Sequence, residues 1–152
     1  MLVSVFSFLF RMSKSVIRRS ARGDVLRSRK TREPRLMQLL VEHGQRIVVF
    51  ELEGAVFFGT AEKLIHQIET AVKDGATAVI VDLKRVTDID STGVRFLVRA
   101  HDAMVKQGRF LLLSSVEEHS RLGQFLRDMG AVAALSKGRV FVDLDQALEW
   151  AE

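Results

Sequence analysis

One short stretch of the chain, Asp88-Ile-Asp-Ser-Thr-Gly93, gathers acidic and hydroxyl side chains at the expected start of a helix. Ser91 and Thr92 would lie beside the first backbone N–H groups of that helix. These groups have no partner within the helix and lie at the positive end of its dipole. A phosphate on Ser91 could be held there, whereas Asp88 and Asp90 would repel it. The same added charge could dislodge a partner from this surface.

The same residue types also have a purely structural use. Asp, Ser and Thr are the usual residues at the N-cap of a helix, where a side-chain oxygen accepts a hydrogen bond from a free backbone N–H. Asp90 or Ser91 could therefore do nothing beyond capping. On the chemistry of these residues alone, two interpretations stay open: a switch that works by phosphorylation of Ser91, and a structural helix cap.

Other patterns typical of catalysis or metal binding do not occur in the sequence. The chain has no cysteine, and the spacing of its four histidines, His43, His66, His101 and His119, would not place them around one metal ion. Neither a Gly-x-Ser-x-Gly pattern nor a P-loop occurs, so an esterase and a P-loop nucleotidase are not supported. His101 falls near the apolar stripe of a helix, which favours a packing histidine with its hydrogen bonds satisfied. We expect neither an enzyme nor a metal site.

The elements that would position the Asp88–Gly93 stretch follow from hydrophobic periodicity. The continuous apolar run over 78–81 predicts a buried parallel strand over 79–83 before it, and an apolar stripe predicts a helix after it, to about Gln107. Further helices are expected over 61–72, 122–129 and 144–151, the first capped by Thr60 and the last by Asp143, with strands over 46–53, 55–58, 110–113 and 140–142. Their alternation predicts an α/β fold with a mixed, mostly parallel sheet of four to five strands and four to five helices.

The first two strands are expected to form an antiparallel hairpin that turns at Gly54 and ends at Gly59. Phe57 and Phe58 are neighbours in its second strand, so they would point to opposite faces. One of them would then be exposed and could contact a partner. A short helix expected over 36–42 would account for both equally well by covering the second face.

A row of charged residues follows Ser91 along the expected helix. Arg95, Arg99, Asp102 and Lys106 recur at helical spacing, so they would share one exposed face beside the Asp88–Gly93 stretch. Such a row is usually a solvated helix face. It is also a candidate docking surface.

The charge of the chain is divided between two regions. Residues 1–35 carry ten Lys/Arg and two Asp/Glu, a net +8, whereas residues 36–152 carry a net −4. A nucleic-acid-binding domain would carry its positive charge on the folded part, with aromatic residues to stack on bases, so no nucleic-acid partner is expected. We interpret 1–35 as a separate arm and 36–152 as one folded domain.

The arm itself has two parts. Its first ten residues are mainly apolar and uncharged, and basic residues begin at Arg11. This order fits the cytoplasmic end of a membrane helix, about half a span long, in a chain cut from a longer membrane protein. A basic linker follows, over 27–34. The alternative is an amphipathic or disordered tail that is apolar by accident.

The stretch Val81-Asp-Leu-Lys-Arg-Val-Thr-Asp-Ile-Asp-Ser-Thr-Gly-Val94 resembles the characteristic loop of STAS domains, which occur in anti-anti-sigma factors and in the cytoplasmic tails of SulP anion transporters. The resemblance covers roughly residues 44–152. It implies that Ser91 matches a serine that a kinase phosphorylates in anti-anti-sigma proteins to release the partner. Asp90 matches the acid before that serine, and Asp82 the acid that ends the preceding strand.

A second stretch, Phe50 to Leu64 with its Phe57-Phe58-Gly59 turn, resembles the SulP branch. The resemblance implies a non-enzymatic STAS domain at the cytoplasmic face of the cell membrane. It would dock to the membrane domain of a sulfate or anion transporter, or to another protein, through a loop surface that comprises Asp82, Asp88, Asp90, Ser91, Thr92, Gly93, Arg95 and Arg99. The alternative is a stand-alone anti-anti-sigma-like switch that binds an anti-sigma kinase. No cofactor is expected. The family invites the idea of a bound nucleotide, but no glycine pattern supports it.

Overall fold

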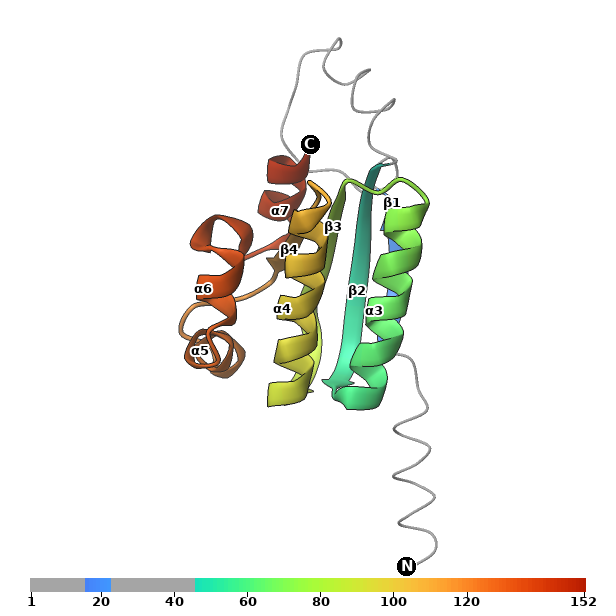
Figure 1. Ribbon diagram of the computed structural model, residues 1–152. Helices are drawn as coiled ribbons and strands as arrows, with labels where there is room; N and C mark the ends of the chain where they lie inside the picture. Colours follow the sequence, from blue (N-terminus) through green and yellow to red (C-terminus); the bar gives the residue numbers. More distant parts are fainter. Residues whose placement is uncertain (1–15, 23–45) are drawn as a thin grey trace, which may run out of the picture.

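The computed structural model describes residues 16–22 and 46–152, which form one sheet with helices on both of its faces (Figure 1). The strands are β1 (Ile17–Arg22), β2 (Ile47–Val56), β3 (Ala78–Ile89) and β4 (Phe110–Ser114). The helices are α3 (Phe58–Lys73), α4 (Ser91–Lys106), α5 (Arg121–Asp128), α6 (Ala131–Leu135) and α7 (Leu144–Ala151), with a 3₁₀ turn over Lys137–Arg139.

The sheet has the strand order β1-β2-β3-β4, in which β1 is antiparallel to β2 and the other pairs are parallel. Helix α3 connects β2 to β3, and α4 connects β3 to β4, so each parallel pair is joined by a crossover helix. In Figure 1, α3 and α4 lie side by side with both N-termini at the end of the sheet where β2 and β3 finish. The expected α/β architecture, a mostly parallel sheet with one antiparallel edge, is confirmed.

Alternation along the strands divides the core between the two faces of the sheet. In β3, Val79 and Val81 belong to the larger core under α3 and α4, whereas Ala78 and Ile80 belong to a smaller core under α7. A strand that is covered on both faces has a continuous run of apolar residues. The run at the start of β3 therefore predicts a buried strand from the sequence alone.

The expected hairpin at Gly54 is wrong. Strand β2 continues through Gly54, which has a φ of +88°, and the pairing with β3 shifts register just after it. Gly54 therefore supplies a positive φ at a strand irregularity instead of a turn. No second strand forms over 55–58 because Phe58 already begins α3, three residues earlier than expected.

Thr60 has a different role from the expected N-cap. It lies in the first turn of α3, where its hydroxyl accepts a hydrogen bond from the Phe57 N–H at 2.8 Å and donates to the Ala55 carbonyl at 3.0 Å. These contacts satisfy a backbone group at the junction between β2 and the helix. The helix therefore begins at Phe58, two residues before Thr60, and the Thr60 side chain stabilises this start from within the first turn.

Three further boundaries differ from the expectation. Strand β3 extends to Ile89, so Thr87 and Asp88 belong to a strand and only Asp90 separates it from α4. The strand expected over 140–142 is reduced to a single bridge between Leu113 and Val140. The short helix α6 was not expected, because five residues are too few to show a helical period.

The antiparallel edge comes from the N-terminal region. Ile17 to Arg22 pair with Leu52 to Val48 of β2, so six residues of the segment expected to be a separate arm belong to the sheet. The expected helix over 36–42, the apolar residues 1–10, the linker over 27–34 and the boundary between 35 and 36 lie outside the described residues and stay predictions. Within residues 16–22 and 46–152, no helix is long and apolar enough to cross a membrane.

Candidate functional site at the start of helix α4

Asp90 is the N-cap of α4. Its backbone is extended, its carboxylate accepts a hydrogen bond from the Gly93 N–H at 2.7 Å, and its carbonyl accepts one from the Val94 N–H at 3.0 Å. The acid thus satisfies one of the free N–H groups at the helix start and complements its dipole. Of the two capping candidates in the sequence, the structure assigns the cap to Asp90, which leaves Ser91 without that task.

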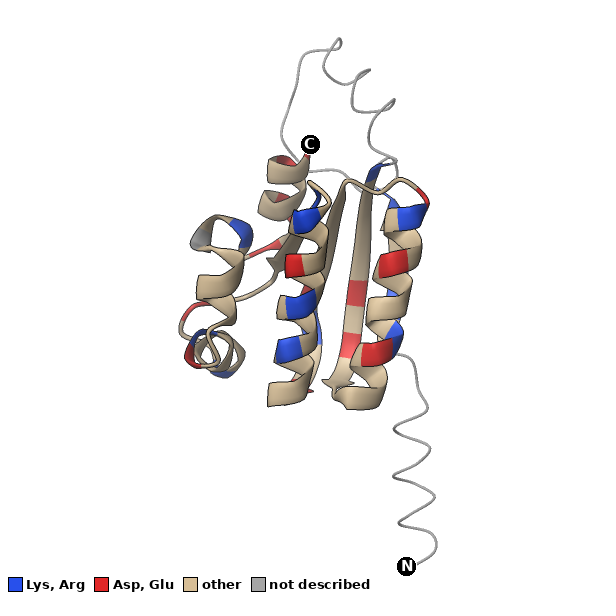
Figure 2. Ribbon diagram, in the orientation of Figure 1, with Lys and Arg blue, Asp and Glu red and all other residues tan. Residues whose placement is uncertain are grey.

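Ser91 is exposed as the first residue of α4, and Thr92 beside it is half-buried. No residue in the described part of the chain forms a hydrogen bond with the Ser91 hydroxyl. Arg95 and Arg99 follow at intervals of four, so they lie on the same exposed stripe of the helix. Figure 2 shows the basic bands along α4. A group added to Ser91 would be exposed to solvent, one helical turn from Arg95.

Gly93 lets the start of α4 approach the end of β2. A Cβ at Gly93 would lie 2.5 Å from the Val56 carbonyl oxygen and 3.0 Å from a side-chain carbon of Ile89. The Asp90 N–H also donates to the same Val56 oxygen, at 3.3 Å. The position of Ser91 relative to the sheet therefore depends on the absence of a side chain at residue 93.

The other two acids expected at the site point elsewhere. Asp88 is exposed, and its carboxylate accepts a hydrogen bond from the neighbouring Ile89 N–H at 2.9 Å. Asp82 is buried and lies in phase with Ala78 and Ile80, on the α7 side of the sheet, whereas α4 packs on the other side. Contrary to the expectation, Asp82 does not lie on the same side of the sheet as Ser91 and α4.

Asp82 instead holds the end of β4. Its carboxylate accepts hydrogen bonds from the hydroxyls of Ser114, at 3.0 Å, and Ser115, at 2.5 Å. Ser115 has a φ of +60°, an uncommon backbone conformation for a residue with a side chain. The two bonds fix this turn. Neither serine is predictable from the sequence, because nothing local relates Ser114 or Ser115 to an acid 32 or 33 residues earlier.

Of the two neighbouring phenylalanines, Phe58 is the exposed one. Its side chain is 58% exposed, and its ring packs edge-on against Phe96 of α4 with 5.8 Å between ring centroids, while Phe57 is half-buried. Because α3 and α4 begin at the same end of the sheet, the ring pair lies at the end of the molecule that also carries Ser91. We call Phe58, Phe96, Ser91 and Arg95 the Ser91 edge. Gly59, within the first turn of α3, lies between this edge and the groove described next.

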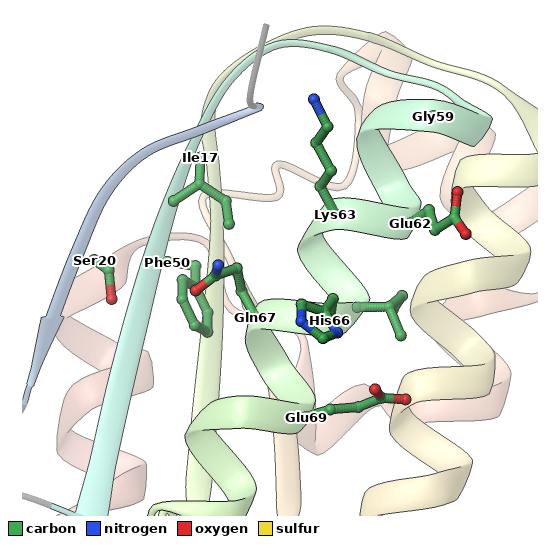
Figure 3. A pocket seen from close by; sticks show the side chains of 10 residues that line it. Ile17, Ser20, Phe50, Gly59, Glu62, Lys63, His66, Gln67 and Glu69 are labelled. Atoms are coloured by element: carbon green, nitrogen blue, oxygen red, sulfur yellow. The ribbon is translucent and has the colours of Figure 1, made fainter. Parts of the chain in front are cut away.

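A groove of about 750 Å³ separates β1 from α3 (Figure 3). In Figure 3, Ile17 of β1 and Gln67 of α3 approach this space from its two sides. Lys63 and His66 also line it, but so do Glu62 and Glu69. Because the carboxylates would repel a phosphate, the groove does not favour the nucleotide that the family resemblance suggested.

His101 departs from the expected packing histidine in one respect. It is buried, but within the described residues its Nδ1 atom has no hydrogen-bond partner. Burial lowers the pKa of this imidazole, and the nearby Arg139 lowers it further, while Asp102 acts in the opposite direction. The described residues contain no cluster of three or more His, Asp or Glu side chains that could hold a metal ion, and His43 lies outside them.

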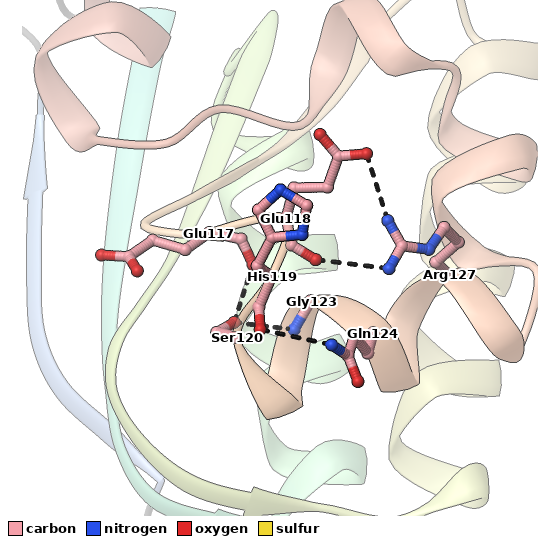
Figure 4. A network of polar contacts seen from close by, with 7 residues as sticks. All are labelled: Glu117, Glu118, His119, Ser120, Gly123, Gln124 and Arg127. Carbon is pink, nitrogen blue, oxygen red and sulfur yellow. Dashed lines mark hydrogen bonds and ion pairs between the residues drawn. The ribbon is translucent and has the colours of Figure 1, made fainter.

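A second polar cluster surrounds the start of α5 (Figure 4). Ser120 caps this helix: its hydroxyl accepts from the Gly123 N–H at 3.0 Å and donates to the Glu117 carbonyl at 2.7 Å. Arg127 donates to the Glu118 carboxylate at 3.2 Å. These contacts close the loop between β4 and α5, and both hydrogen-bonding roles of the Ser120 hydroxyl are taken.

Comparison with known proteins gives a family match over most of the chain. The profile of the STAS domain matches residues 38–146. Glutaminase 2 from Bradyrhizobium diazoefficiens is 33% identical over 129 residues, which cover 82% of this chain but 20% of that protein. The chain thus spans about a fifth of the length of the curated relatives it matches, and the enzyme name of that relative describes a much larger protein.

Solved structures agree with this match. A sulfate transporter family protein from Wolinella succinogenes is 33% identical, with a TM-score of 0.63, over 70% of this chain and 84% of that one. The STAS domain of a SulP transporter from Vibrio cholerae is 27% identical, with a TM-score of 0.59, over 78% of this chain and 94% of that one.

A more distant likeness reaches the anti-sigma factor antagonists. Bacillus SpoIIAA in its phosphorylated form is 20% identical, with a TM-score of 0.55, over 70% of this chain and 92% of that one. At this identity the likeness shows the fold alone. With the profile match and the two transporter relatives, it places the described sheet and helices in one known architecture. The chain belongs to the STAS domain family.

Proposed function

We propose that this chain is the non-enzymatic STAS part of a SulP-type sulfate or anion transporter, on the cytoplasmic face of the cell membrane. Its Ser91 edge docks to the membrane domain of the transporter or to a partner protein, and phosphorylation of Ser91 switches this docking. The observation that carries the proposal is the exposed Ser91 hydroxyl, which has no hydrogen bond in the described part of the chain while Asp90 supplies the helix cap.

The physical effect of a phosphate at Ser91 supports a switch. Phosphorylation adds about −1.5 to −2 charges. The free N–H groups of the first helical turn and the guanidinium of Arg95, one turn away, favour that charge. Asp88 and Asp90 oppose it. Because Phe58, which packs against the half-buried Phe96, is exposed at the same end of the domain, a charged group at this end would penalise an apolar contact there.

Relatives give the proposal its context. The Vibrio cholerae structure is that of a SulP transporter domain, and the Bacillus antagonist has been solved in a phosphorylated form. These descriptions apply to those proteins. They support a docking role and a phosphorylation switch for this chain because this chain shares their fold, and because the resemblance of the Val81–Val94 stretch implies that Ser91 corresponds to the phosphorylated serine.

The size and location of the native polypeptide test the transporter assignment. An antibody to residues 46–152 would be applied to membrane and soluble fractions of cells that make the protein. We expect a band several times larger than the 17.1 kDa of this chain, extracted only with detergent. A soluble band near 17.1 kDa would contradict the assignment and favour the alternative, a stand-alone switch that binds an anti-sigma kinase.

The same purified band tests the modification. Trypsin cleaves after Arg85 and Arg95, so one peptide, 86–95, contains Thr87, Ser91 and Thr92. We expect a phosphate on Ser91 within this peptide. A phosphate on Thr87 or Thr92 alone would overturn the role of Ser91.

A further inference from the structure

The imidazole of His101 lies buried where helix α4 meets the elements that follow it in the chain. The residue is 5% exposed, and its Nδ1 is the only buried side-chain nitrogen or oxygen atom without a hydrogen-bond partner among the described residues. The ring also forms a hydrogen bond with the backbone of Leu111 in β4. Protonation would make Nδ1 a buried N–H donor with no acceptor among these residues. The packed chain therefore favours the neutral ring.

The charged groups around His101 also favour the neutral ring. Burial lowers its pKa most and Arg139, in the 3₁₀ turn after α6, lowers it further, whereas Asp102 and the backbone hydrogen bond act in the opposite direction. Helix α6 and strand β4, which pack against α4, carry no charged residue. Helix α3 lies on the other side of α4 (Figure 1), where Glu69 and Lys73 line a groove to which His101 does not contribute. Arg139 is thus the cation that opposes a proton on His101.

Arg139 belongs to a short segment that fastens helix α7 to the sheet. Its guanidinium lies 4.8 Å from the ring centroid of Phe110 in β4 and 5.8 Å from that of Trp150 in α7. The two rings pack edge to face. Two residues after Arg139, the Phe141 N–H donates to the Leu113 carbonyl of β4 at 2.9 Å. These contacts join the turn, β4 and α7 at one place.

The segment from residue 136 to residue 141, which we call the latch, begins at a strained position. Ser136 has a φ of +68° and a ψ of +149°, a combination that only glycine adopts readily. Such strain persists while the surrounding contacts hold it, and it is relieved when they are released. The latch therefore has a strained end at Ser136 and carries, at Arg139, the cation that lies near His101.

We infer that the latch is a pH-sensitive switch: a proton on His101 repels Arg139, the latch opens at Ser136, and α7 loses this attachment to β4. The closed latch disfavours the proton and the open latch accepts it, so acidification favours the open form. With a pKa of about 6.5 for His101 in the open form and no proton in the closed form, the ratio of open to closed chains rises at most about 25-fold from pH 7 to pH 5. The switch involves neither Ser91 nor its partner, so it goes beyond the proposed function.

Amide hydrogen exchange of the full chain measures the opening directly. The Phe141 N–H exchanges when the latch opens, whereas Val81 lies in the inner strand β3, so its amide reports unfolding of the whole sheet. We expect the protection factor of Phe141, corrected for intrinsic exchange, to fall about 10- to 25-fold from pH 7 to pH 5. Because the opening is local, about 1 M urea should change the protection of Phe141 less than about twofold and that of Val81 about fivefold or more.

Two histidine substitutions identify the titrating group. His101→Gln should hold the protection of Phe141 within a factor of about two between the two pH values. His66→Gln is the matched control, since His66 is exposed on α3, and it should leave the fall unchanged. An equal fall in His101→Gln, or no fall in the unmodified chain, would overturn the inference. A response of Phe141 to urea that matches that of Val81 would overturn it as well, because the chain would then open as a whole.

Arg139→Met tests the repulsion itself and still decides the question if His101→Gln does not fold. Methionine keeps an unbranched side chain but removes the positive charge that disfavours the protonated His101. The fall in the protection of Phe141 between pH 7 and pH 5 should then shrink at least about twofold. A fall as large as in the unmodified chain would contradict the role of Arg139. Circular dichroism of each variant checks that it folds.

Discussion

Helices α4 and α5 begin in nearly the same way, yet only one of the two starts carries a hydroxyl that is available for chemistry. In both, a short polar side chain caps the helix and accepts from the N–H of a glycine three residues later, Gly93 in α4 and Gly123 in α5. In both, that glycine lies against a backbone carbonyl. The difference is the residue that caps: Asp90 in α4 and Ser120 in α5.

This difference decides what each serine can do. Ser120 uses its hydroxyl both as acceptor and as donor, so its oxygen holds the loop before α5. At α4 the carboxylate of Asp90 does the capping, and the hydroxyl of Ser91 stays exposed one residue further on. A helix start thus becomes a candidate switch when a neighbouring acid takes over the structural hydrogen bond.

The largest effects are expected from the two glycines. A Cβ at Gly123 would lie 2.0 Å from the Glu117 carbonyl oxygen, and one at Gly93 would lie 2.5 Å from that of Val56. Backbone must move in both cases, so Gly123→Ala and Gly93→Ala should each lower the free energy of unfolding by about 2–4 kcal/mol. Urea denaturation measures both.

Gly138→Ala serves as the control for the glycine pair, because a Cβ there meets no atom within 4 Å. It should change the free energy of unfolding by less than about 0.5 kcal/mol. If Gly93→Ala were as mild as this control, the close approach of α4 to β2 would not constrain the Ser91 edge.

Removal of the α4 cap should have the next largest effect. Asp90→Ala leaves the Gly93 N–H without its partner, which should lower the free energy of unfolding by about 1–2 kcal/mol. Asp90→Asn keeps an oxygen at the cap and should recover most of this loss. A similar loss in both variants would mean that the negative charge, and not the hydrogen bond, stabilises the helix start.

Substitutions of the two serines should differ clearly in their effect on the free energy of unfolding. Ser120→Ala removes two hydrogen bonds and should cost about 1 kcal/mol, whereas Ser91→Ala should stay within about 0.5 kcal/mol of the unmodified chain. The midpoints of urea denaturation give the comparison. A loss on Ser91→Ala equal to that on Ser120→Ala would show that Ser91 has a structural role.

A smaller effect on stability should depend on pH, through His101 of α4. Burial and Arg139 lower the pKa of His101 in the folded chain below its unfolded value of about 6.5. The unfolded state therefore binds more protons, so this contribution to stability is complete above that value and is lost as the pH falls below it. His101→Gln should reduce the pH dependence of the free energy of unfolding between pH 7 and pH 5. An unchanged pH profile would contradict this role.

Local sequence patterns predicted much of what surrounds the site. The apolar stripes of α3 and α4 and the run in β3 gave the crossover units, and the polar residues before α4 indicated a capped helix start. Which residue caps could not be predicted, because Asp and Ser have similar capping preferences. Packing against the Val56 carbonyl, which fixes the helix start, is a contact 37 residues away in the chain.

The predictions from the sequence that were wrong also have physical causes. Glycine between two apolar stretches predicts a turn at Gly54, but a glycine with a positive φ also fits an irregularity inside a strand. The strand Ile17–Arg22 has three arginines in six residues, and its pairing with β2 depends on a partner 30 residues later. The family resemblance groups Asp82 with Ser91, whereas its alternation with Ile80 puts Asp82 on the other face of the sheet.

Photo-crosslinking in the native membrane tests the central claim most directly. A benzoylphenylalanine would replace Phe96 at the Ser91 edge or, as a matched control, Phe125 of α5, which is equally half-buried. The account predicts a crosslinked adduct from residue 96 that persists with Ser91→Ala and is lost with Ser91→Asp, and no adduct from residue 125. An adduct from residue 96 that survives Ser91→Asp, or one formed only from residue 125, would contradict the Ser91 edge as a switched docking surface.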